Sequence, residues 1–319
     1  MSKAIDVKQA AQLLFDNDRL ALICHASPDG DTLGGAFALC GALQKLQKTA
    51  KVITPEAPSK RFDYLRYGVA VQEFEVGFAV TVDVADAALL GNVEEKYKNN
   101  TDLCIDHHIS NTGYAEHLLL DSDAASACEV VYEVIMELER LGDTELMSAE
   151  IAACLYTGIS TDTGCFRFGN TNAATHRRAA EIIEYGFDLT RLNYLLFDMR
   201  TRERIELEKK ALESIEYYFD GKCAIISLTK AVLSGADEED LNAISSLPRQ
   251  IDGTELGVTF KEKDDNVWKI SLRSKNYIDS RAICAKLGGG GHKKAAGCRI
   301  KGTYEECKNI LLKEIELYI

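Results

Sequence analysis

Residues 20–31 read LALICHASPDGD and join a short apolar run to a loop of potential metal ligands. The run LALIC has the length and composition of a strand that is buried on both faces of a sheet. His25, Asp29 and Asp31 follow it directly, and Gly30 between the two aspartates lets the loop turn tightly. This order predicts a parallel α/β sheet, in which ligands gather at the carboxyl ends of the strands.

The alternation of strands and helices that such a sheet requires continues through the first 190 residues. Strands are expected at Leu20–Cys24, Lys51–Thr54, Val80–Val84 and Asp102–Ile105, and helices at Leu33–Leu46, Cys128–Leu141, Ala149–Ile159 and Ala173–Tyr185. Strands that alternate with helices pack as a parallel sheet with helices on both faces. We therefore predict an α/β domain over residues 1–190.

A change of pattern near residue 190 predicts a second domain. Residues 189–218 are charged and contain neither Pro nor Gly, so we expect a connecting helix over residues 191–218. Strands follow near Cys223–Leu228, Glu255–Lys261 and Val267–Arg273, and a final helix is expected at Tyr304–Leu317. These elements predict a smaller α+β domain over residues 219–319.

Three further motifs place potential ligands at the ends of predicted elements. VDVAD puts Asp83 within or at the end of an apolar strand, where an unpaired carboxylate would be costly to bury. IDHH places Asp106, His107 and His108 after the next strand, and YTGISTDTGCF places Asp162 at the end of a helical stretch. A single Asp-x-Asp is usually a turn or a cap, but the joint occurrence after successive strands favours one site.

The donor set is typical of a site for divalent cations. Histidine with several carboxylates suits Mn²⁺ or Mg²⁺ better than thiophilic metals. Carboxylates that converge on one edge repel each other unless cations lie between them. Two ions that share one carboxylate would relieve this repulsion and activate a water nucleophile.

Cysteine usage and hydropathy favour a cytoplasmic protein. The ten cysteines are scattered, form no C-x-x-C pair and lie mostly in apolar runs, which is typical of free, buried thiols and does not favour a cysteine zinc site. No apolar run approaches the roughly 18 residues of a membrane span. The first residues, MSKAIDVKQAAQLL, lack the features of a signal peptide. We expect no membrane partner.

The distribution of charge favours a small anionic substrate. The chain carries a formal net charge of −13, which argues against a protein that coats long duplex nucleic acid. Residues 267–302 nevertheless contain nine basic side chains and one acid, so this segment carries +8 and the remainder about −21. A solvated basic face is the alternative interpretation. A long strand would extend from the basic segment into repulsive surface, so short substrates are expected.

A glycine-rich segment, GGGGHKKAAG at residues 288–297, is a candidate anion site. Its four consecutive glycines free backbone N–H groups to line an anion, and a helix that begins near His292 would direct its positive end at the same anion. A flexible hinge is the alternative. Arg273, at a predicted strand end, is a second candidate phosphate ligand.

HASPDGD, VDVAD, IDHH, STDTG and GGGGH together resemble the DHH phosphoesterase superfamily with its DHH-associated C-terminal domain. Size and layout are most similar to its nanoRNase/pAp phosphatase group. The resemblance implies a manganese-dependent enzyme that degrades short RNA to mononucleotides and converts 3′-phosphoadenosine 5′-phosphate (pAp) to AMP. A homodimer is expected. A phosphodiesterase for linear dinucleotides such as pApA and a non-catalytic nucleotide sensor remain alternatives.

The resemblance also implies roles for individual residues. The first ion would be held by His25, Asp29 and Asp83, and the second by Asp31, Asp83, His107 and Asp162. His108 would face the scissile phosphate, and Asp106 would orient a neighbouring histidine. The substrate's phosphates would be held by Arg273, Ser274, Gly290, Gly291 and His292.

Overall fold

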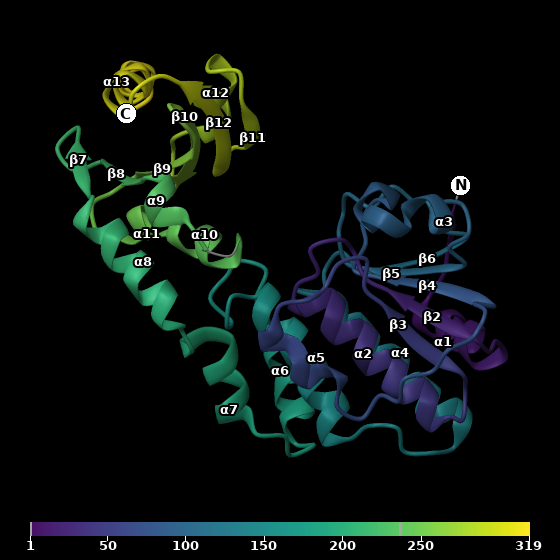
Figure 1. The fold of residues 1–319 in the computed structure, drawn as a ribbon. Coiled ribbons are helices and arrows are strands. Elements are labelled where there is room, and N and C mark those ends of the chain that lie inside the picture. The colour runs from purple at the N-terminus through teal and green to yellow at the C-terminus, as the bar shows by residue number, and fades with distance from the viewer. Residues whose placement is uncertain (1, 236–237) are drawn as a thin grey trace. The chain divides into compact units, whose positions relative to one another are not determined.

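The computed structural model describes residues 2–235 and 238–319, which form two compact units (Figure 1). The first unit is Met1–Met199 and the second is Arg200–Ile319. The division falls inside the segment that was expected to connect two domains. Each unit has its own hydrophobic core, so each is described by itself.

The N-terminal unit contains a six-stranded sheet in which every neighbouring pair of strands is parallel. In spatial order the strands are β1 (Lys3–Ala4), β6 (His117–Leu120), β5 (Leu103–Asp106), β4 (Phe78–Val82), β2 (Leu20–Ile23) and β3 (Ala50–Ile53). The three central strands are wholly buried, as their continuous apolar sequence predicts. The predicted parallel α/β fold is confirmed.

Helices cover both faces of this sheet, but unequally (Figure 1). The larger core lies under α1 (Val7–Asp16), α2 (Gly30–Lys45), α4 (Ala127–Gly142) and α5 (Ala149–Asp162). The other face is covered by the 3₁₀ segment η2 (Ala87–Val93) and the short α3 (Glu94–Tyr97). The 3₁₀ segment η1 (Lys60–Arg66) packs against α2 and α5, and α6 (Ala173–Ile183) packs against α5, so both contribute to the larger core.

Small residues bring α2 and α5 close together. A Cβ atom on Gly34 would lie 2.4 Å from the carbonyl oxygen of Cys154, and one on Gly30 would lie 2.4 Å from Thr161 Oγ1. Both distances are far below a normal contact, so only glycine fits at these positions. As a result the C-terminal end of α5, with Asp162, lies next to the loop that follows β2.

The predicted connecting segment, residues 191–218, is not one helix, contrary to the prediction. It contains α7 (Leu189–Asn193), the π-helical turn η3 (Tyr194–Asp198), α8 (Arg202–Glu213) and then the strand β7 (Glu216–Tyr218). Met199 is in extended conformation, and Thr201 caps α8 by accepting the N–H of Arg204. The helical segment therefore stops before Met199, and Thr201 begins a new helix as its N-cap. Helical propensity alone does not reveal such a break.

The C-terminal unit is an α+β domain with a second six-stranded sheet. Its strands in spatial order are β11 (Gly290–His292), β12 (Ala295–Lys301), β10 (Val267–Ser274), β9 (Leu256–Asp264), β8 (Cys223–Leu228) and β7. Only β8 and β9 pair in parallel. One face packs on α12 (Ser280–Lys286) and α13 (Tyr304–Ile315). On the other face, β8 and β9 pack on α8, α9 (Lys230–Leu233), α10 (Glu238–Ile244) and α11 (Leu247–Gln250).

The glycine-rich segment does not begin a helix at His292, so that prediction was wrong. Residues Gly290–His292 form β11, which pairs antiparallel with β12. Gly291 has φ 138°, and a Cβ atom there would lie 2.6 Å from the carbonyl oxygen of Ala295. The glycines therefore allow a close strand pair rather than a helix N-terminus.

Among the described residues, no helix has the length and apolar character needed to span a bilayer.

Candidate metal centre and phosphate site

Polar side chains from five segments of the chain meet at the carboxyl edge of the parallel sheet. His25 follows β2, Asp83 follows β4, and Asp106 ends β5. The loop after β5 supplies His107 and His108. The two remaining sources are helices: Asp29 and Asp31 lie at the start of α2, and Asp162 is the last residue of α5.

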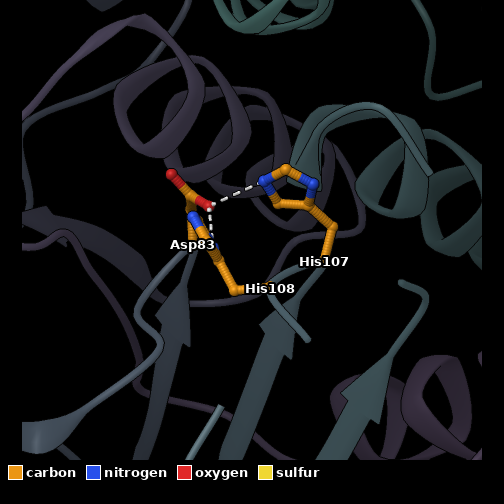
Figure 2. Close-up of side chains that lie close together, drawn as sticks. All are labelled: Asp83, His107 and His108. Carbon is orange, nitrogen blue, oxygen red and sulfur yellow. Dashed lines mark ion pairs between the residues drawn. The ribbon is translucent and has the colours of Figure 1, made fainter. Parts of the chain in front are cut away.

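Asp83 belongs to two of the ligand groups at this edge, and Figure 2 shows its carboxylate beside the rings of His107 and His108. Its carboxylate is 5% exposed and lies near three histidines: Oδ2 is 3.8 Å from His25 Nε2, and Oδ1 is 3.5 Å from His107 Nε2 and 3.3 Å from His108 Nδ1. Its backbone is left-handed, with φ 60°, which is strained for a residue other than glycine. Strain of this kind persists at sites where the surrounding structure fixes one arrangement.

The orientation of His107 leaves one ring nitrogen for the cluster. Nδ1 lies 3.2 Å from the carbonyl oxygen of Ala124 and donates its hydrogen there, so Nε2 carries a lone pair. This Nε2 atom lies 3.9 Å from Asp31 Oδ2 and 3.7 Å from Asp162 Oδ2. A histidine held through one nitrogen by a carbonyl is the usual arrangement of a metal ligand.

His25 is held in the same way. Its Nδ1 lies 2.7 Å from the carbonyl oxygen of Ala26, and its Nε2 lies 3.6 Å from Asp29 Oδ1. Burial acts to lower the pKa of His25, but the nearby carboxylates of Asp29 and Asp83 outweigh it and raise the pKa. The negative charges of Asp29 and Asp83 therefore favour positive charge beside the His25 ring, either as a proton or as a metal ion.

Asp31 is buried at the N-terminus of another helix. Its Oδ2 accepts the N–H of Ala127 at 2.7 Å and its Oδ1 accepts the N–H of Cys128 at 3.0 Å, in the first turn of α4. Burial, with the charges of Asp83 and Asp162, still raises the pKa of Asp31. Burial and the charges of neighbouring aspartates likewise raise the pKa of Asp162 to about 6. These carboxylates repel each other in the absence of cations.

The arrangement fits divalent cations. Asp83 Oδ1 and His107 Nε2 are buried, lie 3.5 Å apart and have no hydrogen-bond partner, which is unusual for buried polar atoms. A cation between them would satisfy both. The donor atoms form three groups that could hold an ion: His25, Asp29 and Asp83; Asp31, His107 and Asp162; and Asp83, His107 and His108. Asp83 and His107 each belong to two of them.

Asp106 is a partner of His108 and not a member of these groups. Its Oδ1 accepts from His108 Nδ1 at 2.9 Å and from the backbone N–H of His107 at 2.8 Å. Its Oδ2 accepts from Asn111 Nδ2 at 2.6 Å. The hydrogen bond to Asp106 and the nearby carboxylate of Asp83, whose Oδ1 lies 3.3 Å from His108 Nδ1, raise the pKa of His108 to about 11. The half-exposed His108 ring is thus fixed with Nε2 as its available nitrogen.

Three residues that support the centre were not predicted. A Cβ atom on Gly158 would lie 2.5 Å from Asp31 Oδ1 and 2.1 Å from Cys128 Sγ, so this position admits only glycine. Asn111 holds Asp106, and Asn170 Nδ2 donates to Asp162 Oδ2 at 3.3 Å. All three lie in or near the motifs in sequence, but nothing in their spacing indicated the contacts.

The predicted phosphate ligands of the C-terminal unit lie around the pairing of β10, β12 and β11. Arg273 and His292 are both paired with Ala295, so they share one face of the sheet. Ser274 is buried, and its hydroxyl lies 3.4 Å from the carbonyl oxygen of Lys293, so it supports this turn. Gly290 is exposed and leaves open space where a side chain would stand.

A second arginine lies beside Arg273. Burial lowers the pKa of Arg273, and the positive charge of Arg249 on α11 lowers it further. Arg249 can come near because Gly257, the β9 partner of Arg273, has no side chain. A Cβ atom on Gly257 would lie only 2.5 Å from the backbone nitrogen of Arg249. Adjacent arginines are typical of an anion site. In the sequence Arg249 stands only as an isolated basic residue.

Comparison with known proteins agrees with both parts of the chain. The DHH family N-terminal domain matches residues 19–159, and the DHHA1 domain matches residues 225–319. The bifunctional oligoribonuclease and PAP phosphatase NrnA of Thermus thermophilus is 33% identical over 282 residues, which cover 87% of this chain and 83% of that protein. The protein of the same name from Bacillus subtilis is 28% identical over 300 residues, covering 92% and 93%.

A solved structure shows the same fold. The exopolyphosphatase-related protein from Bacteroides fragilis superposes with a TM-score of 0.84 at 23% identity, and the match covers 98% of this chain and 96% of that one. The sequence relatives extend over most of both chains, and the two domain matches occur in the same order as the two units. The chain therefore belongs to the DHH family and carries a DHHA1 domain after its DHH domain.

Proposed function

We propose that this protein is a two-metal phosphoesterase that degrades short oligoribonucleotides to mononucleotides and dephosphorylates pAp to AMP. Two relatives that bear the name of oligoribonuclease and PAP phosphatase support this assignment. The observation that carries it is the pair of unsatisfied buried atoms, Asp83 Oδ1 and His107 Nε2, within a cluster of carboxylates. We propose Mn²⁺ as the metal and a cytoplasmic location. The expected homodimer stays a prediction.

In this proposal the chain holds two cations with Asp83 between them. His25, Asp29 and Asp83 would hold one ion, and Asp31, Asp83, His107 and Asp162 would hold the other. Divalent ions bound there would polarise a phosphoryl oxygen and lower the pKa of water. The protein itself would fix the carboxylates before the ions bind. The backbone N–H of Ala127 at the α4 N-terminus holds Asp31, and the side chain of Asn170 holds Asp162.

His108 would act on the phosphate that is cleaved. Asp106 fixes His108 Nδ1, so Nε2 is the atom that would meet the substrate. A protonated ring would neutralise charge on the phosphate oxygens or give a proton to the leaving oxygen. Asp106 is thus proposed as a catalytic partner that acts through His108.

The C-terminal unit would hold phosphates of the substrate. Arg273 and His292 share a face, and Gly290 of β11 leaves that face without a side chain beside them, while Gly291 lets β11 lie close against β12. Arg249 adds a second guanidinium near Arg273. Ser274 would contribute by keeping the turn after β10 in place.

A substrate and metal panel tests the proposal. The purified protein would be stripped of metal and then incubated with pAp, pApA, an RNA dinucleotide and an RNA 24-mer, each with Mn²⁺, Mg²⁺ or no added metal. We expect phosphate release from pAp and cleavage of the dinucleotide with Mn²⁺, and slower cleavage of the 24-mer. Tight nucleotide binding without any turnover would instead identify a sensor, and a strong preference for pApA would identify a dinucleotide phosphodiesterase.

A further inference from the structure

The C-terminal sheet has a basic face that the proposed function does not yet use in full. Three alternate residues of β10 are buried in the core with α12 and α13: Trp268, Ile270 and Leu272. Successive side chains of a strand point to opposite faces. Lys269, Ser271 and Arg273 therefore lie on the face of the sheet opposite α12 and α13.

The register of β12 extends this face. Lys269 pairs with Arg299, Ser271 pairs with Gly297, and Arg273 pairs with Ala295. The face thus has three rows across the sheet. Lys269 and Arg299 form one basic row, Ser271 and Gly297 form a row of small residues, and Arg273 forms a second basic row with His292. Lys269 is partly exposed, and His292 and Arg299 are exposed.

Four basic residues on or beside this face have no acidic partner among the described residues. Within the parts of the chain that the structure describes, none of the following forms an ion pair with a carboxylate: Arg249, Lys269, Arg273 and Arg299. Like charges placed together without a counter-charge repel, and bound anions relieve the repulsion. Beyond Arg299 the next row holds Lys301, Val267 and Asp264, so the first acidic residue of the register lies at that end of the face.

We propose that Lys269 and Arg299 form a second phosphate subsite, which receives the backbone of single-stranded oligonucleotides longer than a dinucleotide. The inference rests on the proposed function, in which Arg273 and Arg249 hold the first phosphate. Lys269 lies four residues from Arg273 along an antiparallel strand, so the two rows are about 13 Å apart. A dinucleotide held at Arg273 has no further phosphate at that distance, whereas a longer strand has.

The small residues between the two basic rows indicate one continuous binding surface for a nucleotide strand rather than two separate sites. The floor between the rows consists of Ser271, which is 8% exposed, and the partly exposed Gly297, and the exposed Gly290 of β11 pairs with Gly297 at its side. Without large side chains, sugars and phosphates can lie close to the sheet. Basic side chains at both ends then hold the phosphates, and the contact is independent of base sequence.

The test compares substrates of different length in a charge-matched pair of variants. The test variant is Lys269→Gln with Arg299→Gln. The control is Arg281→Gln with Lys286→Gln, which loses the same charge from exposed positions of α12, on the other face of the sheet. KM and kcat would be measured with pAp, pApA and an RNA hexamer, and binding of a labelled hexamer by fluorescence anisotropy across a salt series.

We expect the test variant to raise KM for the hexamer about tenfold and to leave KM for pAp and pApA unchanged. Each lost phosphate contact removes about 0.7 from the slope of log affinity against log salt, so the double variant should lose about 1.4. The control should keep wild-type values. Equal effects on hexamer and pApA, or equal effects of the two variants, would refute the subsite while the proposed function stands. If wild-type protein hydrolyses none of the substrates, the proposed function fails, and the anisotropy series alone decides the subsite.

Discussion

The most informative single residue is Asp83, because its carboxylate lies within 3.8 Å of three histidines. We expect Asp83→Asn to lower kcat about a thousandfold, since the loss of several kcal/mol of electrostatic stabilisation corresponds to that factor. Calorimetric titration of metal-free protein with Mn²⁺ should also show weaker binding. Asp123→Asn, an exposed aspartate of the same unit, is the control. Normal metal content with normal turnover in Asp83→Asn would contradict the two-ion arrangement.

The residues that the sequence reveals are those that follow buried strands. His25, Asp83, Asp106 and His107 could be identified because a charged or imidazole side chain at the end of a buried apolar strand needs a partner or a metal. Gly158 could not, since its contacts with Asp31 and Cys128 join three helices that are distant in sequence. Arg249 was missed for the same reason: its neighbour Arg273 comes from a different element.

Among the elements, α5 depends on one glycine for its position. In Gly158→Ala the new Cβ would overlap Cys128 Sγ and Asp31 Oδ1, which lie within 2.1 and 2.5 Å of its ideal place. Overpacking of this kind costs about 1–3 kcal/mol. We expect urea unfolding to show this loss, together with weaker Mn²⁺ binding because Asp31 must move. Gly169→Ala is the matched control, since nothing lies within 4 Å of a Cβ there; similar losses in both variants would show that the packing argument is wrong.

A second element-scale prediction concerns the turn after β10. Glu255 Oε1 accepts the backbone N–H groups of Asn276, Tyr277 and Ile278 at 2.7, 2.7 and 3.2 Å. Burial acts to raise the pKa of Glu255, but these donors outweigh it and hold the pKa below its ordinary value of 4.5. The native state therefore binds fewer protons than the unfolded state, so Glu255 stabilises the fold above pH 4.5 and the stabilisation is lost as the pH falls through the native pKa.

We accordingly expect Glu255→Gln to lower the free energy of unfolding at pH 7 by about 1–3 kcal/mol. The difference from wild type should narrow as the pH falls below 4.5. Urea unfolding followed by circular dichroism at several pH values measures both effects. Glu316→Gln, at an exposed position near the C-terminus, should change neither. A difference that stays constant with pH would mean that the charge of Glu255 is not what stabilises the turn.

Element prediction succeeded where burial alone determines structure. The central strands β2, β4 and β5 lie within two residues of the predicted ranges, because strands buried on both faces are apolar throughout. The edge strand β1 and its neighbour β6 were missed: they have only two and four residues, too few for a strand pattern to stand out in the sequence. The helix expected at His292 was wrong because glycines next to β12 favour a close strand pair, which depends on a distant partner.

At the scale of the whole molecule, the two units have separate cores, and among the described residues the carboxylate cluster lies in the first. Binding of cations should therefore stabilise the N-terminal unit and leave the C-terminal unit unchanged. A ligand at one hundred times its dissociation constant stabilises the state that binds it by about 2.7 kcal/mol. The gain in stability should be largest around the carboxylate cluster, because its carboxylates repel each other when no metal is bound.

Hydrogen exchange with and without Mn²⁺ measures this directly. We expect slower exchange in the first turns of α2 and α4 and in the loops after β4 and β5, because these segments carry or hold Asp31, Asp83 and His107. Exchange in β8 and β9 should not change. Asp83→Asn protein should lose most of the protection, which links the effect to the cluster rather than to ionic strength. Equal protection of both sheets would show that the units unfold together or that the metal binds elsewhere, and the two-core description would then fail.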